Sequence, residues 1–166
     1  MMKKNLHLLC ITFFIAIGLN SCGSSECFDN QNTLPLAGFY SMQTGKEIIV
    51  DSLTVYGAGA PGDSVLLDNG QVSSLYMPMP LSGSSASFVF HYNMKALDFV
   101  EFNDTLTIDY ECYPQFVSNE CGAIYKYDVS DFRYTTHLID SVAIPTMKFD
   151  NVDKVVIKVF YRTSEK

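Results

Sequence analysis

The sequence predicts an all-β fold, an antiparallel β-sandwich of two sheets with an immunoglobulin-like or prealbumin-like arrangement. Apolar and polar residues alternate over short spans, and aromatic residues make up 13% of the chain, with 10 Tyr, 12 Phe and no Trp. Turn-forming residues recur roughly every 8 to 12 residues, and we expect roughly nine or ten strands and no amphipathic helix. A closed β-barrel is the alternative, because it has the same alternation and differs only in shear.

In the first half of the chain, the Asn69-Gly70 pair is the clearest turn. The type I′ turn of a tight hairpin needs a positive φ at both central residues, and Asn-Gly meets that need. Pro78 and Pro80 should end the next strand or place it at an edge, where a missing N–H breaks no ladder bond. A loop is expected over 57–63. The strands expected here span residues 51–56, 64–67 and 72–77.

In the second half, two strands have one apolar and one polar face. Residues 85–93 place Phe88, Phe90 and Tyr92 on one face. Residues 105–112 place Leu106, Ile108, Tyr110 and Cys112 opposite Thr107, Asp109 and Glu111. Turns are expected at Asn103-Asp104 and at Tyr113-Pro114-Gln115. The remaining strands are expected over 97–102, 116–127, 138–144 and 155–161.

The first 21 residues have the plan of a signal peptide, with a signal helix. Lys3 and Lys4 precede an uncharged apolar run over 6–19, and a polar stretch follows at once. The run is shorter than the ~20 residues that span a bilayer core, so a permanent transmembrane helix is the weaker interpretation. Leu19-Asn20-Ser21-Cys22 resembles a lipobox, and Asn20 departs from the residue usual there.

Cys22 is the expected site of lipid attachment, because its thiol can form a thioether with diacylglycerol. Two or three acyl chains would anchor the protein stably in a membrane. The alternative is an ordinary secretory signal with a free cysteine nearby, and both interpretations imply export. We expect a signal peptide over 1–21, a lipidated tether over 22–32 and a single sandwich domain over 33–166.

The charge of the chain narrows the expected partners. The whole chain has a formal charge of −7, and without Lys3 and Lys4 the mature chain carries −9. This argues against nucleic acid and anionic lipid headgroups as partners. The four residues directly after Cys22, Gly23-Ser24-Ser25-Glu26, contain one acid, so a strongly acidic surface-export signal is not evident. We therefore expect an outer-membrane lipoprotein that faces the periplasm, with surface exposure as the alternative.

The chain has 5 cysteines, of which three remain after signal removal and lipidation: Cys27, Cys112 and Cys121. In an oxidising compartment we expect one disulfide and one leftover thiol, and the residues themselves leave the connectivity open. No Cys-x-x-Cys spacing is present and the histidines are scattered, so no zinc site is expected.

Several short motifs together resemble an uncharacterised lipoprotein family of the phylum Bacteroidota, a domain of unknown function. They are Cys22 with Cys27, Thr33-Leu34-Pro35, Gly38-Phe39-Tyr40, residues 50–57, Met77-Pro78-Met79-Pro80-Leu81, residues 105–110 and Asn119-Glu120-Cys121-Gly122. The resemblance covers nearly the whole mature chain and brings no activity.

This resemblance implies a disulfide between Cys27 and Cys121, with Cys112 as a packed core thiol. Such a bond would close a loop of over ninety residues and contribute about 4 kcal/mol in the chain-entropy model. The competing bond between Cys112 and Cys121 would close a short loop and contribute less.

Catalytic residues are not evident in the sequence. The serine-rich stretch 82–85 lacks the pattern of a nucleophile elbow, and turn formation explains it. His91 lies within a predicted strand and His137 opens another, so we interpret both as structural histidines. Asp109 and Glu111 share a strand face, which a solvated surface explains better than a glycosidase pair.

No cofactor or metal ion is expected either. Asp63, Asp68 and Asp104 are expected in loops, but their spacing matches no calcium-binding loop. Turn formation is the simpler role for all three aspartates.

We therefore expect a non-enzymatic interaction module in the cell envelope, an accessory subunit of an outer-membrane protein complex whose partner is a β-barrel. The alternative is a surface lipoprotein that binds a carbohydrate or another small ligand. Tyr125, Tyr127 and Tyr134 could stack on such a ligand, contact a partner or belong to the core. An enzyme is the third choice.

Overall fold

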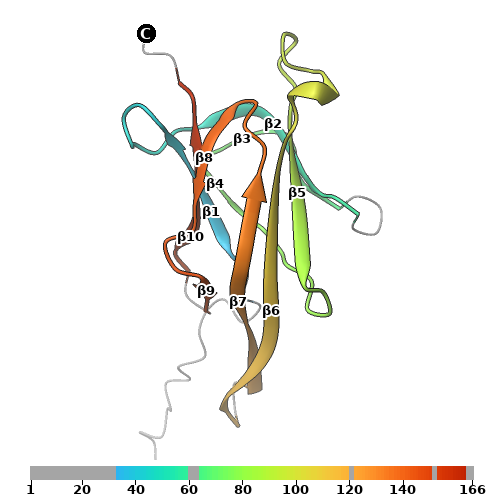
Figure 1. Ribbon diagram of the computed structural model, residues 1–166, viewed down its shortest axis with the longest axis vertical. Helices are drawn as coiled ribbons and strands as arrows, with labels where there is room; N and C mark the ends of the chain where they lie inside the picture. Colours follow the sequence, from blue (N-terminus) through green and yellow to red (C-terminus); the bar gives the residue numbers. More distant parts are fainter. Residues whose placement is uncertain (1–32, 60–63, 120–121, 151–152, 164–166) are drawn as a thin grey trace, which may run out of the picture.

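The computed structural model describes residues 33–59, 64–119, 122–150 and 153–163, and it is a β-sandwich (Figure 1). The four-stranded sheet has the order β4 (Ser74–Tyr76), β1 (Leu36–Ser41), β10 (Val155–Tyr161), β8 (Ile139–Ala143). The six-stranded sheet has the order β3 (Val65–Val72), β2 (Val50–Gly57), β5 (Ser85–Tyr92), β6 (Asp104–Ser118), β7 (Gly122–Tyr134), β9 (Lys148–Phe149). Among these strands β1 and β10 pair in parallel and the other pairs are antiparallel. The predicted sandwich is confirmed.

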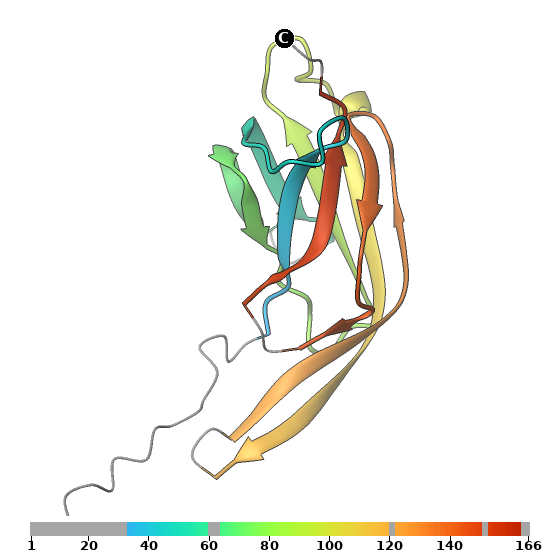
Figure 2. The same ribbon diagram turned by 90° about the vertical axis from the view of Figure 1, so that its left-hand side faces the viewer.

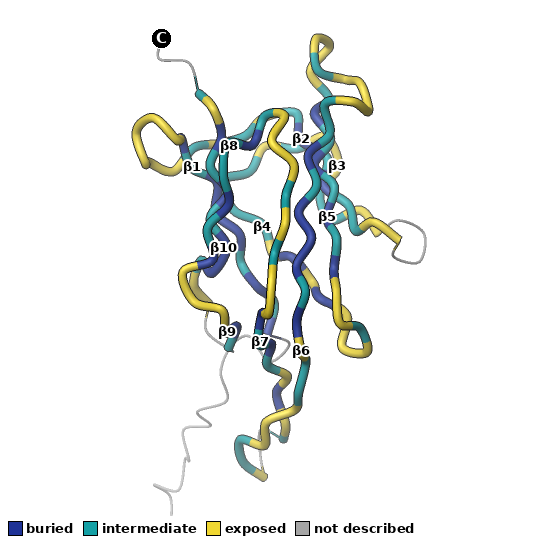
Figure 3. The backbone as a smooth tube through the Cα atoms, in the orientation of Figure 1, coloured by how far each residue is buried: buried dark blue, intermediate teal, exposed yellow. Residues whose placement is uncertain are grey.

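The core lies between the two sheets and is rich in aromatic side chains. Phe39 of β1 packs edge-to-face against Phe90 of β5 and Tyr161 of β10. The predicted dry face of β5 is confirmed, since Phe88, Phe90 and Tyr92 are 2%, 0% and 1% exposed. Along these strands buried and solvent-facing positions alternate (Figure 3), as expected for sheets with one dry side.

The hairpin predicted at Asn69-Gly70 is wrong, because β3 continues through both residues. Asn69 has the expected positive φ of 43°, but its backbone N–H donates to Thr54 Oγ1 on the neighbouring strand β2. The register between β2 and β3 shifts around Leu53, which pairs with Gly70, so the Asn-Gly pair absorbs a bulge. A Cβ at position 70 would lie 2.6 Å from Leu67 Cδ1, which favours glycine there.

Two further predictions in the second half are wrong. Residues 97–102 form turns and the 3₁₀-helix η2 (Val100–Phe102), not a strand. β6 runs through Tyr113-Pro114-Gln115 to Ser118, so the turn comes later than predicted. Pro114 is tolerated because β5 pairs with β6 only as far as Asp109, which leaves one side of β6 open at that point.

Two of the connections between the sheets lie at opposite ends of the sandwich, at the bottom and at the top in Figure 1. The lower crossover, residues 77–84, leads from β4 to β5 and contains the Met77-Pro78-Met79-Pro80 motif. The upper crossover, residues 135–138, leads from β7 to β8. Beside the lower crossover, β6 and β7 project beyond the rest of the sandwich as a two-stranded ribbon (Figure 2).

Several predictions lie outside the described residues. The signal helix over 1–21, the tether over 22–32, Cys22, and the pairing of Cys27 with Cys121 all stay predictions. Within the described ranges no helix has the length and hydropathy of a membrane span. Cys112 is the one cysteine in these ranges; it is a free thiol, partly buried against the core.

Candidate interaction surface at the loop end

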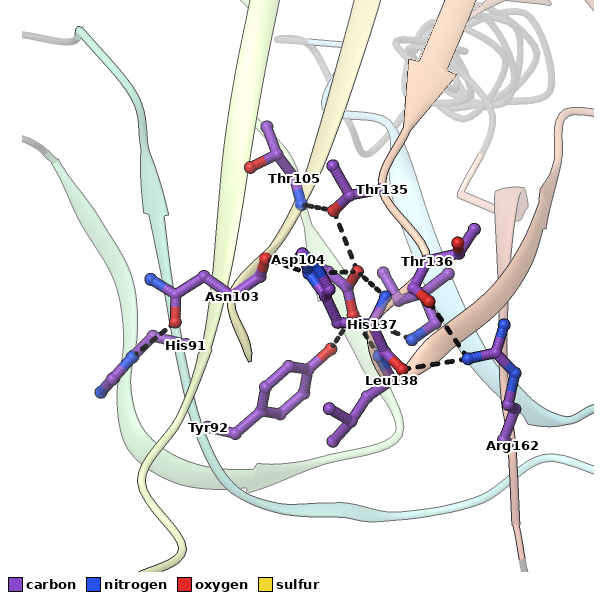
Figure 4. Close-up of polar contacts among 11 residues, drawn as sticks. His91, Tyr92, Asn103, Asp104, Thr105, Thr135, Thr136, His137, Leu138 and Arg162 are labelled. Atoms are coloured by element: carbon purple, nitrogen blue, oxygen red, sulfur yellow. Dashed lines mark hydrogen bonds and ion pairs between the residues drawn. The ribbon is translucent and has the colours of Figure 1, made fainter. Parts of the chain in front are cut away.

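The carboxyl group of Asp104, at the start of β6, is the centre of the polar contacts at the upper end of the sandwich (Figure 4). Asp104 is fully buried and accepts five hydrogen bonds. Oδ1 accepts from Thr135 Oγ1 at 2.9 Å and from the His137 backbone N–H at 2.7 Å. Oδ2 accepts from the Tyr92 hydroxyl at 2.9 Å and from the N–H groups of Leu138 and Ile139 at 2.8 and 2.9 Å.

These contacts hold the upper crossover in place. A connection between sheets has no ladder partners, so its backbone N–H groups need acceptors from elsewhere when they are shielded from water. Asp104 supplies the acceptors for three consecutive N–H groups. Arg162 supplies donors on the other side, since its Nη1 bonds the carbonyl oxygens of Thr136 and His137 at 3.1 and 3.0 Å.

A second set of contacts holds the loop between β5 and β6, residues 93–103. His91 Nδ1 lies 2.8 Å from Asn103 Oδ1, and His91 Nε2 lies 3.1 Å from Asp98 Oδ1. At the start of the loop, Asn93 Nδ2 donates to Thr54 Oγ1 at 2.8 Å. The loop is therefore tied to the sandwich at its beginning, its middle and its end.

This loop carries apolar side chains on its outside. Val100, Phe99 and Met94 are 80%, 50% and 43% exposed, and Ile49, which precedes β2, is 69% exposed. Ile49, in the loop between β1 and β2, and Met94, in the loop between β5 and β6, line the same hollow, so these two loops lie next to each other. We call Ile49, Met94, Phe99 and Val100 the loop-end patch. Exposed apolar side chains on a loop already held by hydrogen bonds suit a protein contact, because little ordering remains to be done on binding.

The hollow next to the patch is apolar and has a volume of about 200 Å³. Its lining residues are Ile48, Ile49, Val50, Asp51, Tyr92, Met94, Leu138 and Tyr161. The Tyr161 hydroxyl is buried and has no hydrogen-bond partner in the structure. Burial is the main cause that raises the pKa of both Tyr161 and Tyr92; the interaction between the two hydroxyls lowers the pKa of Tyr161 and raises that of Tyr92, and nearby Asp104 raises both, so both phenols stay neutral.

The histidines and paired acids singled out in the sequence form no catalytic arrangement with one another. His91 contacts Asn103 and Asp98, whereas His137 Nδ1 lies 2.9 Å from the Asn103 carbonyl oxygen. Asp109 is bonded to Arg133, and it shares the outer face of β6 with Glu111 as predicted, on either side of the buried Tyr110. Hydrogen bonds from Ser85 and then from Arg133 lower the pKa of Asp109.

The roles predicted for the aspartates and tyrosines changed most. Asp104 was expected in a turn but begins β6 and is buried, because it lies on the same side of the strand as Leu106 and Ile108. Of the three tyrosines, Tyr127 is a core residue at 1% exposure and Tyr125 is 38% exposed. Tyr134 stacks on Phe132 and is half-buried.

No group of three or more His, Cys, Asp or Glu side chains lies close enough to hold a metal ion within the part of the chain that the structure describes. Asp63 lies outside that part, and Asp68 lies within β3.

The fold and the loop-end patch define an all-β sandwich with a candidate protein-contact surface. A family model described as a family of unknown function, DUF6452, matches residues 52–161, from β2 to the end of β10. The chain belongs to this family, which agrees with the expected uncharacterised domain. No curated protein shows significant similarity to the chain. No solved structure does so either.

Proposed function

We propose that the chain is a lipid-anchored protein of the bacterial cell envelope, held in the outer membrane by Cys22, and that its sandwich is a non-enzymatic interaction module. On this proposal it is an accessory subunit of an outer-membrane protein complex and faces the periplasm. The signal peptide and the lipobox support the location. We also propose that the family consists of lipoproteins of the phylum Bacteroidota.

The observation that carries the interaction role is the loop-end patch. Val100 is 80% exposed and Ile49 is 69% exposed, although each could be polar at no cost to the fold. The loop beneath Val100 is held by side-chain hydrogen bonds at Asn93 and Asn103. An apolar surface on a preorganised loop binds a partner with a small entropy cost.

Site-specific crosslinking tests the interaction role. A photo-crosslinking amino acid at Val100, in the full chain in native envelopes, should yield one adduct of discrete mass with an envelope protein. The matched control is Val65, a 58% exposed valine on edge strand β3 outside the patch, which should yield none. A chain that is solitary with the probe at either site contradicts the proposal.

The lipid anchor has its own test. Cys22→Ala should abolish incorporation of labelled fatty acid and release the chain from membranes. A variant that still incorporates the label and stays in membranes would refute the lipobox.

Binding of a small ligand is the second candidate, and the hollow next to the patch favours it. Aliphatic side chains dominate the lining, so an apolar ligand fits better than a carbohydrate, which would need several polar partners. The Tyr161 hydroxyl could give such a ligand one hydrogen bond after a local shift. Leu138→Trp should fill the hollow, so ligand binding there would be lost while crosslinking at Val100 would persist.

A further inference from the structure

The β6–β7 ribbon has an unusual exposed position. β5 pairs with β6 only between Asp104 and Asp109, and β9 pairs with β7 only at Tyr127 and Asp128. Beyond these points the two strands pair only with each other, as far as Ser118 and Gly122. At about 3.3 Å per residue, the stretch from Cys112 to Ser118 reaches about 20 Å beyond the sandwich.

The far part of the ribbon is apolar and nearly uncharged. Phe116 is 66% exposed and Tyr125 is 38% exposed. Phe116 pairs with Ala123, and Pro114 pairs with Tyr125, so these side chains belong to one face of the ribbon. Between Glu111 and Lys126 the sequence contains one charged residue, Glu120. We call Phe116 and Tyr125 the ribbon tip.

The described chain starts at the same end of the molecule as the ribbon. The Pro35 carbonyl oxygen accepts from Met77 N–H, and the Met79 carbonyl oxygen accepts from the Tyr127 hydroxyl at the ribbon's base. Thr33 therefore lies near the base of the ribbon, and the ribbon extends away from the sandwich at this end (Figures 1 and 2). The loop between β5 and β6, which carries most of the loop-end patch, lies at the other end (Figure 1).

The distance from Cys22 to Thr33 is limited by the covalent chain. Eleven residues span at most about 40 Å when fully extended. The ribbon reaches about half that distance, since it extends roughly 20 Å beyond the sandwich. A bilayer that holds lipid on Cys22 thus lies within reach of the ribbon tip.

We propose that the ribbon tip docks onto the lipid interface of the membrane that holds Cys22. This inference rests on the lipid anchor of the proposed function. Phe and Tyr side chains suit the headgroup region, where an apolar ring and a polar hydroxyl both find partners.

Docking of the tip has a consequence for the whole molecule. Two attachments, the lipid and the ribbon, orient the sandwich and direct the loop-end patch away from the bilayer. The side chains of the tip are uncharged, and the charged residues that flank them in the sequence, Glu120 and Lys126, have opposite signs, so the contact depends mainly on apolar burial. Added salt should therefore change it little.

The chain contains no Trp, so Phe116→Trp introduces a single fluorophore at the tip. The lipidated full chain would be placed in vesicles of phosphatidylethanolamine and phosphatidylglycerol, with or without bromine on the acyl chains. The indole emission of the Phe116→Trp variant should shift to the blue and lose most of its intensity to the brominated lipid, in low and in high salt. The matched control, Phe99→Trp in the loop-end patch, should keep solvent-like emission and resist quenching.

The outcomes separate this inference from the anchor. Vesicle flotation reports the anchor alone, and a chain with intact Cys22 that fails to float overturns both proposals. A Phe116→Trp chain that floats with solvent-like indole emission overturns the ribbon contact and leaves the anchor standing. A blue shift without bromine quenching means that a protein covers the tip, which also overturns it. Tyr125→Trp repeats the measurement from the facing strand, so a local disturbance at position 116 cannot decide the result.

Discussion

The upper and the lower crossover, two of the connections between the sheets, are held by different means. The upper crossover, 135–138, depends on one buried carboxyl group that accepts from three consecutive backbone N–H groups. The lower crossover, 77–84, depends on two tyrosine hydroxyls from the base of the ribbon: Tyr127 donates to the Met79 carbonyl oxygen at 3.0 Å and Tyr110 to the Pro80 carbonyl oxygen at 2.7 Å. The hydrogen bonds of the upper crossover converge on Asp104, whereas those of the lower crossover are divided between Tyr110 and Tyr127.

This difference predicts how well each crossover tolerates an amino-acid substitution. Met77 and Met79 anchor the lower crossover in the core at 0% and 5% exposure, and prolines limit its backbone freedom. The upper crossover lacks such anchors in 135–137, which are exposed, and relies on hydrogen bonds. A single substitution should therefore damage the upper end far more than the lower one.

Asp104→Ala should have the largest effect. It leaves the three N–H groups and the Tyr92 hydroxyl without their acceptor inside the fold, and each buried donor left without a partner costs about 1 to 3 kcal/mol, so we expect a loss of several kcal/mol. Urea denaturation measures the loss in free energy of unfolding. The control is Asp98→Asn, whose 57% exposed side chain should matter by less than about 0.5 kcal/mol. Equal losses for both variants would contradict the central role of Asp104.

Thr135→Val should come next, because the Thr135 hydroxyl joins two elements. Its oxygen accepts from Thr105 N–H and donates to Asp104 Oδ1, both at 2.9 Å. We expect a loss of about 1 to 2 kcal/mol and faster hydrogen exchange over 135–139. The neighbouring exposed Thr136 provides the matched substitution, Thr136→Val, which should leave exchange unchanged. If hydrogen exchange instead accelerates uniformly over the whole chain, the upper crossover does not open independently of the rest of the fold.

At the lower end, Tyr127→Phe should cost about 0.5 to 1.5 kcal/mol by removing the hydrogen bond to Met79. The ring stays packed on Tyr110, 5.3 Å away between centroids, so packing is kept. Exchange should accelerate at the lower crossover but not at residues 135–139. Tyr125→Phe on the exposed ribbon should change nothing measurable in unfolding. A loss for Tyr127→Phe as large as that for Asp104→Ala would break the contrast between the two ends.

Sequence alternation predicted the regular strands of both ends, since burial repeats every second residue in β5 and in β10 from Ile157 to Tyr161. It missed the importance of Asp104, because the backbone N–H groups that it binds in and after the upper crossover stand over thirty positions away in the chain. A clue was present: extending the strand 105–112 by one residue puts Asp104 on the apolar face with Leu106 and Ile108. A polar residue on a dry face needs buried partners.

Local turn chemistry was a weaker guide than strand alternation. Asn69-Gly70 suits a hairpin and a bulge equally, because both need a positive φ, and the pairing of β3 with β2 decides between them. Pro114 suggested a turn, yet it lies in β6 beyond the reach of β5. In both cases the decisive information is which strand lies alongside, which composition within a few residues does not contain.

The smallest expected effect concerns Asp109, where β6 leaves the sandwich and the ribbon begins. Hydrogen bonds from Ser85 and Arg133 hold the pKa of the Asp109 carboxyl below its ordinary value of 3.8. A pKa that is lower in the folded chain than in the unfolded chain stabilises the fold above pH 3.8, and this stabilisation is lost as the pH falls through the folded value. Asp109→Asn should therefore lower the urea midpoint slightly at pH 6, and the difference from the unmodified chain should shrink toward pH 2. Exposure of the Asp109–Arg133 pair keeps the effect small, and added salt should weaken it further. If the difference instead grows on acidification, the fold favours the protonated form of Asp109. The ion pair with Arg133 would then not stabilise the base of the ribbon.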